Sequence, residues 1–588
     1  MSTRAGVVTI AGVSIAVYLG ALSCGFAGDD FMILHRLREA GGLAGAARFF
    51  RGEFFEYYRP LPFVLHALDW TLAGARASQF HLTNLLLHAL NAVLVVLIGR
   101  ELSPRTAAGP IAGLLFALHA SNHEAVVWIS ARFDVLATLF SLAAIWWTVR
   151  APDRSTWLAP LLFLCATLSK ESTVALPIAA AAFWIFIRRS TTAEATWRVA
   201  PWLAALVGYS VLRRMAGGVS AIGGTGRLPK LLAFAAVLGA VLLLDDGRWL
   251  RMRDWLRDRR ARAMTAMAAI ALGCAAMAAI GGTSGRLCAD KLAVAGFAIV
   301  HLVSPVIDVF SMPFYLDPRT AMYWGGGAIA ILFALAVLAA LWTPLVDDDR
   351  AWFLGGLLVA ALLPISALTE GTRYLYLPSA AVSLLIGVLV GGLTHRGRTI
   401  ATAAIAIYLA VSATAIVLKV RDWQWAGRMI ADGATMVDSS LAPSCGEGHV
   451  VFLTEPVAVH GVYTHFLYET FELPRGCIPA AFEILTRMMR IDTTVNARWD
   501  GPSRIVMTFP DYRGNLSLSS DLRNFDPTLR PSTGDRRRTP LGEVVARADG
   551  HAAEVTLTIP PSVDASHIQW FYYSDGAMRP LKSDLRHQ

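Results

Sequence analysis

The sequence predicts a polytopic α-helical membrane protein with roughly thirteen membrane-crossing helices and a soluble C-terminal domain of the α/β or β-rich class. Of the 588 residues, 55% are hydrophobic and only 16% are charged, whereas soluble globular proteins carry about 25% charged residues. The mean hydropathy is +0.50. Apolar runs of about twenty residues recur between Val7 and Leu418, long enough to cross a hydrocarbon core. Such runs must be helices, because in lipid every backbone amide needs a partner within the protein.

The first apolar run, Val7 to Phe26, is expected to be a retained membrane helix. It is longer than the apolar region of a secretory signal, which spans about 7–15 residues, and no small-residue cleavage site follows it. With later runs it makes about fourteen candidate spans. The later runs are His81–Leu102, Ala107–His119, Asp134–Val149, Leu158–Leu168, Thr173–Ile187, Trp202–Val211, Leu231–Leu244, Ala263–Ile280, Leu292–Phe310, Ala328–Leu341, Trp352–Ala367, Tyr374–Leu393 and Ile400–Leu418.

The orientation follows from the basic loops, which stay in the cytoplasm. The loops rich in arginine are 100–105, 150–154, 188–198, 248–262 and 395–398. They account for the net charge of +9 without nucleic-acid binding. The remaining loops and the C-terminal domain then lie outside the cytoplasm. These loops are 27–79, 119–132, 169–171 and 370–373. This requires an odd number of crossings, so one candidate between Ala263 and Phe310 is in excess, and residues 281–291 are a candidate re-entrant segment.

Two domains are expected, a membrane domain over residues 1–425 and an extracytoplasmic strand-rich domain over residues 426–588. The strand signals of the second domain are short β-branched or aromatic segments bounded by Pro, Gly and Asp: HVVFLTEP, SRIVMTFP, AEVTLTIP and IQWFYY. Cys445 and Cys477 both fall in this domain. They form a disulfide if the domain is extracytoplasmic, or remain two unpaired buried thiols.

The first outer loop, 27–79, carries the acidic pair Asp29-Asp30. Adjacent carboxylates repel each other, and a carboxylate screened at a membrane boundary is a candidate general base toward a hydroxyl. Alternatively, Asp30 caps the helix that begins at FMILHRL. In the same loop, Arg59 precedes Pro60 and is a candidate phosphate ligand, since the guanidinium matches two phosphate oxygens at once. A solvated or headgroup-anchoring arginine is the alternative.

Polar residues inside or beside the spans form the remaining candidates. His81, Asn84 and His88 share one helix face, as interhelical hydrogen-bonding groups or as part of a substrate pocket. His123 and Glu124 lie in LHASNHEAVVWISARFD, where a divalent metal is an alternative, although no zinc spacing is present. Further candidate pocket residues are Asp134, Glu171, Tyr374 and Tyr376. Arg132, Lys170 and Arg373, with Arg59, are expected at the same outer face as the acidic pair, where they would meet one anionic substrate.

The strings GDDF, YYRPLPF, FHLTNLLLHALNA, LLFALHASNHEAVVWISARFDVLATLF, LSKES and TRYLYLPS occur in this order. Together they resemble the membrane portion of GT-C glycosyltransferases, over roughly residues 5–430. The likeness is to the protein O-mannosyltransferase-like branch that carries tetratricopeptide repeats, and to its bacterial relatives. Two features depart from this family. His119 is followed by Ala120 instead of proline, and the C-terminal region is strand-rich instead of repeat-bearing.

The resemblance implies transfer of a sugar from a polyprenyl-phosphate carrier to a protein or glycan hydroxyl outside the cytoplasm. It implies a single inverting displacement with Asp29 or Asp30 as base. Arg59, Arg132, Lys170 and Arg373 would then stabilise the leaving phosphate. No cofactor is expected, and the predicted location is the plasma (bacterial inner) membrane. The rival hypotheses are a transporter or lipid flippase, and a non-catalytic scaffold with an outer binding domain.

Overall fold

The computed structural model of the protein describes residues 3–52, 58–216, 227–244, 246–258, 301–302, 342–364, 371–440, 449–456, 458–459, 462–463, 481–488, 494–510, 516–517, 534–548, 553–565, 568–574 and 577–582. Its chain divides into two compact units. The helical unit comprises Met1–Leu22, Glu39–Phe310 and Pro318–Val420. The second unit comprises Ser23–Arg38, Ser311–Asp317 and Arg421–Gln588. Residues 23–38 therefore group with the C-terminal part of the chain.

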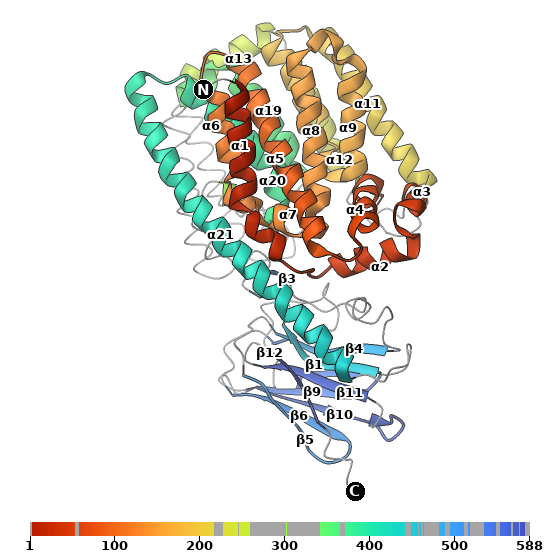
Figure 1. The fold of residues 1–588 in the computed structure, drawn as a ribbon. Coiled ribbons are helices and arrows are strands. Elements are labelled where there is room, and N and C mark those ends of the chain that lie inside the picture. Colours follow the sequence, from red (N-terminus) through yellow and green to blue (C-terminus); the bar gives the residue numbers. More distant parts are fainter. Residues whose placement is uncertain are drawn as a thin grey trace. The chain divides into compact units, whose positions relative to one another are not determined.

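The helical unit is a bundle of long helices (Figure 1). Its longer helices are α1 (Thr3–Val17), α4 (Pro60–Ala73), α5 (Ala77–Leu102), α6 (Ala108–Ala117), α8 (Arg132–Arg150), α9 (Ser155–Ser169), α11 (Thr192–Met215), α12 (Arg227–Leu242), α13 (Asp246–Asp258), α19 (Asp349–Leu362), α20 (Tyr376–Gly391) and α21 (His395–Ser440), the last of which continues into the second unit. Shorter pieces are η1 (Leu19–Ser23), η2 (Gly42–Gly45), α3 (Ala46–Phe50), η3 (Ala120–Asn122), α7 (His123–Val127), η4 (Ile129–Ala131), η5 (Pro152–Arg154), η6 (Glu171–Thr173), α10 (Pro177–Ala182), η7 (Phe183–Ile187), α18 (Trp342–Asp347) and η9 (Thr372–Leu375).

Four stretches within the described residues are long and apolar enough to cross a membrane: Ala77–Leu102, Ile129–Arg150, Thr372–Gly391 and His395–Met436. Shorter apolar helices accompany them, at Ala5–Val17, Ala108–Ala117, Trp157–Ser169 and Glu171–Ile187. The prediction of a largely helical membrane protein is confirmed in this coarse form. Three predicted spans and the predicted re-entrant segment lie outside the described residues, apart from residues 301–302. The spans are 263–280, 292–310 and 328–341, and the re-entrant segment is 281–291. The expected count of thirteen therefore stays a prediction.

The first predicted span differs in one respect from the structure. Helix α1 ends at Val17, and the 3₁₀ helix η1 follows it, so Val7–Phe26 is not one continuous helix. The buried ring of Tyr18 lies at this break, edge-on to His88 of α5 at a centroid distance of 5.2 Å. The predicted outer loop 27–79 also contains helices, namely α2 (Asp30–Ala40), α3 and α4.

Small residues bring three central helices, α5, α6 and α20, close together. A Cβ atom added to Gly99 of α5 would lie 2.8 Å from the Cα atom of Gly109 in α6, and one added to Gly387 of α20 would lie 2.5 Å from the Ala108 carbonyl oxygen. Such close backbone approach is how helices gain packing energy in lipid, where burial of apolar surface contributes little. These contacts fix the helices whose ends carry the polar clusters described below.

Among its described residues, the second unit contains two five-stranded sheets. The first is mixed, in the order β12-β11-β1-β4-β7, with β1 (His449–Pro456) parallel to β11 (Ile568–Ser574) and to β4 (Ala481–Met488). Its edge strands β7 (Leu516–Ser517) and β12 (Ala577–Pro580) are antiparallel. The second sheet is antiparallel, in the order β5 (Asn496–Trp499), β6 (Arg504–Phe509), β10 (Ala553–Thr558), β9 (Gly542–Ala548) and β8 (Arg536–Thr539). A two-stranded ladder joins β2 (Ala458–Val459) and β3 (Val462–Tyr463).

The strand-rich prediction for the C-terminal region is confirmed. The four segments singled out in the sequence coincide with β1, β6, β10 and β11. Their alternation explains why: in β10 the side chains of Ala553, Val555 and Leu557 are buried, and the residues between them are less so. The two cysteines proposed for a disulfide, Cys445 and Cys477, lie outside the described residues.

Candidate functional site

Three ion pairs gather at one end of the helical unit, and their six residues are called the ion-pair cluster below: Arg59–Glu171, Lys170–Asp134 and Arg373–Glu124. The Arg59 pair is bidentate, with Nε donating to Oε2 at 2.8 Å and an η nitrogen to Oε1 at 2.5 Å. Arg59 is the residue before helix α4, and Pro60 occupies the first turn. Proline is well placed there, because its missing N–H would have no partner within the helix.

The Lys170–Asp134 pair is the most deeply buried pair of the cluster. Nζ of Lys170 donates to both carboxylate oxygens of Asp134 at 2.6 Å, and the two side chains are 6% and 7% exposed. Asp134 lies in the first turn of α8, where the helix dipole favours a carboxylate. Lys170 caps the C-terminus of α9, where the dipole favours a cation. The pair therefore fits both helix ends that it joins.

The third pair holds Glu124, of α7, against the loop before α20. Arg373 donates to Glu124 from its guanidinium and from its backbone N–H, the latter at 2.9 Å, and the Thr372 hydroxyl donates to the same carboxylate at 2.9 Å. Burial would raise the pKa of Glu124, but the Arg373 charge and these hydrogen bonds outweigh it and lower that pKa. Glu124 is thus an ionised, fully engaged carboxylate.

Tyr374 connects two of the pairs. Its ring lies 4.5 Å from Nζ of Lys170 and 4.6 Å from the guanidinium carbon of Arg373, and its hydroxyl accepts a hydrogen bond from Arg373 at 3.1 Å. The guanidinium carbon of Arg59 lies 5.4 Å from the ring centroid of Phe133, the residue that precedes Asp134 in the chain. The structure therefore brings Arg59, Lys170 and Arg373 together, each matched by a carboxylate, so that the cluster has no net charge.

Arg132 occupies a different place from the other candidate cations. Its side chain is 0% exposed and forms an ion pair with Asp69 at 2.7 Å. It also donates to the Asn84 side chain at 2.7 Å and to the Phe80 carbonyl at 2.8 Å. These contacts tie α8 to α4 and α5, which favours a structural role for Arg132. Asp69 was not among the residues singled out in the sequence, although a carboxylate within the apolar run of α4 was an available signal.

The histidine face of α5 is buried as a whole, with His81, Asn84 and His88 each at most 1% exposed. Nδ1 of His88 lies 2.7 Å from the Tyr376 hydroxyl, and Nε2 lies 3.2 Å from the Ala117 carbonyl. Asn91 donates to the Val135 carbonyl at 3.0 Å. This network joins α5, α6, α8 and α20, so His88 and Tyr376 are placed among the central helices.

His123 is buried on α7, one residue before Glu124. His66 of α4, which was not singled out in the sequence either, is fully buried among the rings of Phe63, Phe80 and Phe133. Among the residues that the structure describes, no group of three His, Cys, Asp or Glu side chains could hold a metal ion.

The acidic pair Asp29-Asp30 belongs to the second unit. Asp30 is the first residue of α2, is 2% exposed, and accepts a hydrogen bond from the Ala27 backbone N–H at 3.0 Å. A carboxylate that reaches back three residues in this way stabilises the start of a helix. Gly28 has φ of 52° in the same turn, a left-handed conformation that favours glycine. Asp29 is partly exposed, so it is the more accessible carboxylate of the two.

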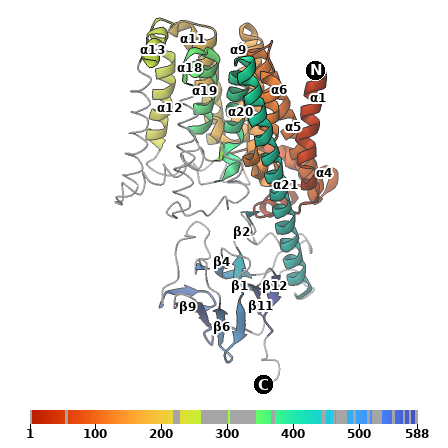
Figure 2. The ribbon, with the colours of Figure 1, turned by 90° about the vertical axis from the view of Figure 1, so that its left-hand side faces the viewer.

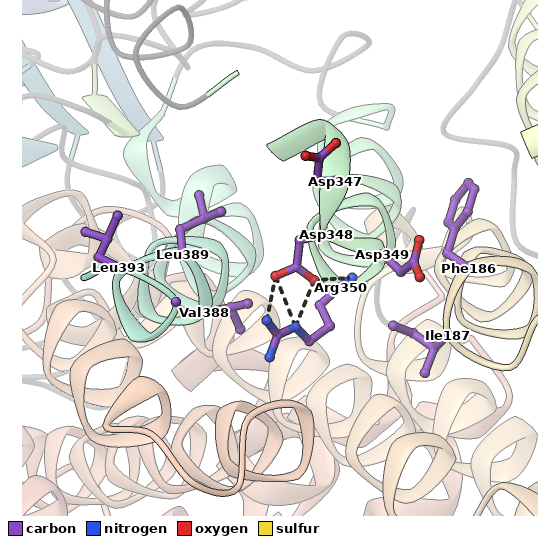
Figure 3. Close-up of a pocket in the computed structure, with 10 residues that line it drawn as sticks. Phe186, Ile187, Asp347, Asp348, Asp349, Arg350, Val388, Leu389 and Leu393 are labelled. Atoms are coloured by element: carbon purple, nitrogen blue, oxygen red, sulfur yellow. Dashed lines mark hydrogen bonds and ion pairs between the residues drawn. The ribbon is translucent and has the colours of Figure 1, made fainter. Parts of the chain in front are cut away.

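A second polar site in the helical unit is a cavity of about 590 Å³ between η7, the start of α19 and the end of α20 (Figure 3). Three consecutive aspartates line it, and each is paired with an arginine: Asp347 with Arg257, Asp348 with Arg350, and Asp349 with Arg189. Arg350 also donates to the Ser103 hydroxyl at 2.6 Å, at the C-terminus of α5. The ion-pair cluster lies at the opposite end of the helical unit, so this cavity is separate from it.

Comparison with known proteins supports the resemblance found in the sequence. No protein-family model matches the chain. It is 28% identical over 200 residues to the protein O-mannosyl-transferase TMTC3 of Homo sapiens, which covers 31% of this chain and 22% of that protein. It is also 28% identical over 184 residues to Tmtc1 of Drosophila melanogaster, covering 29% of this chain and 21% of that protein.

This chain resembles the TMTC protein O-mannosyltransferases. The match spans about a fifth of the length of these curated relatives. Among solved structures, the archaeal oligosaccharyltransferase AglB from Archaeoglobus fulgidus, in complex with an inhibitory peptide and a dolichol-phosphate, aligns with 82% of this chain and 64% of that chain. The sequence identity there is 12% and the TM-score is 0.45.

Proposed function

We propose that the protein is a membrane glycosyltransferase that moves a sugar from a polyprenyl-phosphate donor to a protein or glycan hydroxyl on the extracytoplasmic face. The observation that carries the proposal is the ion-pair cluster, in which Arg59, Lys170 and Arg373 meet at the ends of apolar helices. The sequence similarity to O-mannosyltransferases supports the same reaction class. The outer location rests on the distribution of basic loops and is part of the proposal.

In the proposed reaction the acceptor hydroxyl oxygen attacks the anomeric carbon of the donor. The bond from that carbon to the phosphate oxygen breaks, and its electron pair leaves with the polyprenyl phosphate. The hydroxyl proton passes to an aspartate, which we assign to Asp29, because Asp30 is buried and bonded within its own turn. One displacement inverts the anomeric configuration and needs no covalent enzyme intermediate.

The cluster would stabilise the negative charge that develops on the leaving phosphate. Arg59 and Arg373 are 13% and 14% exposed, whereas Lys170 is 6% exposed, so we assign the contact with the phosphate to the two arginines. Their carboxylate partners hold each guanidinium in place before the donor arrives. Preorganised donors of this kind contribute most when they need not move during the reaction. Because Arg132 is enclosed by Asp69, Asn84 and Phe80, we now assign it to positioning α8 instead of to the phosphate.

The experiment is sugar transfer in membranes that contain wild type, Asp29→Asn or Asp30→Asn protein, followed with a labelled polyprenyl-phosphate sugar. Asp153→Asn serves as the matched control, since Asp153 is 79% exposed and outside the cluster. We expect Asp29→Asn to abolish transfer while the protein still inserts, and the control to retain it. Transfer by Asp29→Asn protein at the wild-type rate would remove the base assignment. Movement of labelled lipid across the membrane without any transfer would favour a transporter or flippase.

A further inference from the structure

Helix α13 carries an arginine-rich sequence, DGRWLRMRDWLRD, that the proposed reaction does not use. It follows the apolar helix α12 after three residues and is drawn at one end of the helical unit in two perpendicular views (Figures 1 and 2). The same end holds the C-terminus of α5 and the start of α19, joined through Arg350 and Ser103. The ion-pair cluster lies at the other end, because it sits at the start of α8 and before α20.

One face of α13 is fixed to the bundle. Trp249 is 0% exposed, with ring centroids 4.9 Å from Phe186 and 4.5 Å from Trp352, and its Nε1 donates to Asp349 at 3.3 Å. Near the other end of the helix, Arg257 forms an ion pair with Asp347. The helix is therefore held at two points, and its rotation about its own axis is set.

The opposite face of α13 presents a continuous stripe of exposed side chains. Arg248, Arg251 and Trp255 are all exposed, Trp255 by 50%. They are spaced three and four residues apart, so they lie next to one another on the helix surface. Leu250, which is 38% exposed, lies about 100° around the helix from Arg251, and Arg248 also donates to the Leu243 carbonyl at 3.0 Å. A stripe of two cations and a large amphipathic ring differs from an ordinary solvated face, on which an exposed tryptophan is rare.

We propose that this stripe, formed by Arg248, Arg251 and Trp255, binds the headgroups of anionic phospholipids in the leaflet opposite the ion-pair cluster. The charge is complementary, since arginine pairs with phosphate through two hydrogen bonds. A basic helix with tryptophan on its exposed side is typical of segments that lie in the membrane interface. Tryptophan is also the residue enriched at headgroup level, where its ring meets both apolar and polar surroundings. The stripe is thus a lipid contact of the bundle and is independent of the proposed reaction.

The test uses the purified full-length protein in detergent, titrated with phosphatidylglycerol or phosphatidylcholine that carries brominated acyl chains. Quenching of tryptophan fluorescence reports binding, and Trp255→Phe protein identifies the part of the signal from Trp255. We expect a clear preference for phosphatidylglycerol in wild type. In the double variant Arg248→Gln/Arg251→Gln, the ratio of the affinities for the two lipids should fall by about thirtyfold. This is the usual effect of removing two basic residues near an anionic surface. The double variant Arg248→Lys/Arg251→Lys, which keeps the charge, should retain most of it.

The matched control is Arg538→Gln/Arg547→Gln, which removes two exposed arginines of the second unit and should bind as wild type does. If a variant does not fold, binding to wild type is measured at low and high salt. High salt should abolish the preference for phosphatidylglycerol, because it screens the charges of the stripe. Equal affinity for the two lipids, or an unchanged preference in the glutamine variant, would overturn the proposal. Displacement of the lipid by millimolar inorganic phosphate would overturn it as well, because it would show a free-phosphate site.

Discussion

The pair formed by Lys170 and Asp134 allows the cluster's energetics to be measured without knowing the substrate. Nζ lies 2.6 Å from both carboxylate oxygens, and both side chains are almost fully buried. Asp134→Asn would leave a buried ammonium group without its counter-charge, and Lys170→Met would leave a buried carboxylate. Breaking a buried pair in this way costs about 3–5 kcal/mol of unfolding free energy.

The double variant Lys170→Met/Asp134→Asn removes both charges at once. Since no unpaired charge remains, we expect it to be more stable than the sum of the single effects by about 2 kcal/mol or more. The assay is reversible unfolding in mixed micelles as denaturing detergent is added, read by circular dichroism for the four proteins of the cycle. This coupling energy is the quantity that the structure predicts.

The chain supplies a matched control in Arg150 and Glu101, whose closest atoms are 3.3 Å apart but whose side chains are 60% and 28% exposed. The same cycle on this pair should give a coupling energy of about 0–1 kcal/mol, because water screens it. If the buried pair coupled no more strongly than Arg150 and Glu101, the burial and geometry described for the cluster would be refuted.

Three further outcomes are expected. Gly99→Val should lower the unfolding free energy in the same assay by about 1–3 kcal/mol or more, because its Cβ would meet Gly109 of α6; a neutral result would contradict the close helix approach. Tyr376→Phe should cost about 1–3 kcal/mol, since the buried His88 ring would lose the hydroxyl 2.7 Å away, and stability equal to wild type would exclude that hydrogen bond. The pKa of Glu124 is lowered in the folded protein, so its contribution to stability is complete above its ordinary pKa of 4.5 and is lost as the pH falls below it. Unfolding at pH values from about 2 to 7 should show this acid loss in wild type and a smaller one in Glu124→Gln protein; identical profiles would contradict the shift.

Periodicity and charge patterning predicted most of the elements. The apolar runs at 81–102, 134–149 and 374–393 became α5, α8 and α20, because a long apolar segment has few alternatives to a helix. The alternating segments of the C-terminal region became strands for a comparable reason, since one face is buried. The break after Val17 carried no equivalent signal in the sequence, and Tyr18 at this break packs against His88, which is far along the chain.

The sequence allowed the positions of the candidate cations to be predicted, but not the carboxylates with which they pair. Arg59, Lys170 and Arg373 were expected on one face because their loops alternate with basic ones, and the structure brings them together. Which carboxylate faces which cation depends on tertiary packing, so the pairing of Arg373 with Glu124 could not be read from spacing. Arg132 was grouped with the other cations for its position at a helix start, but its partner Asp69 came from a helix expected to be part of a loop.

The most direct test of the proposed function is transfer of label from a polyprenyl-phosphate sugar by the purified protein, comparing wild type with Arg373→Gln and with Arg538→Gln as the control. Gel filtration and the unfolding assay establish that each protein is folded. We expect transfer by wild type and the control, and a loss of about 10²–10³ in rate for Arg373→Gln, the usual cost of removing one charge-stabilising donor. Failure of folded wild type to consume the donor, or an unchanged rate in folded Arg373→Gln protein, would contradict the proposed function.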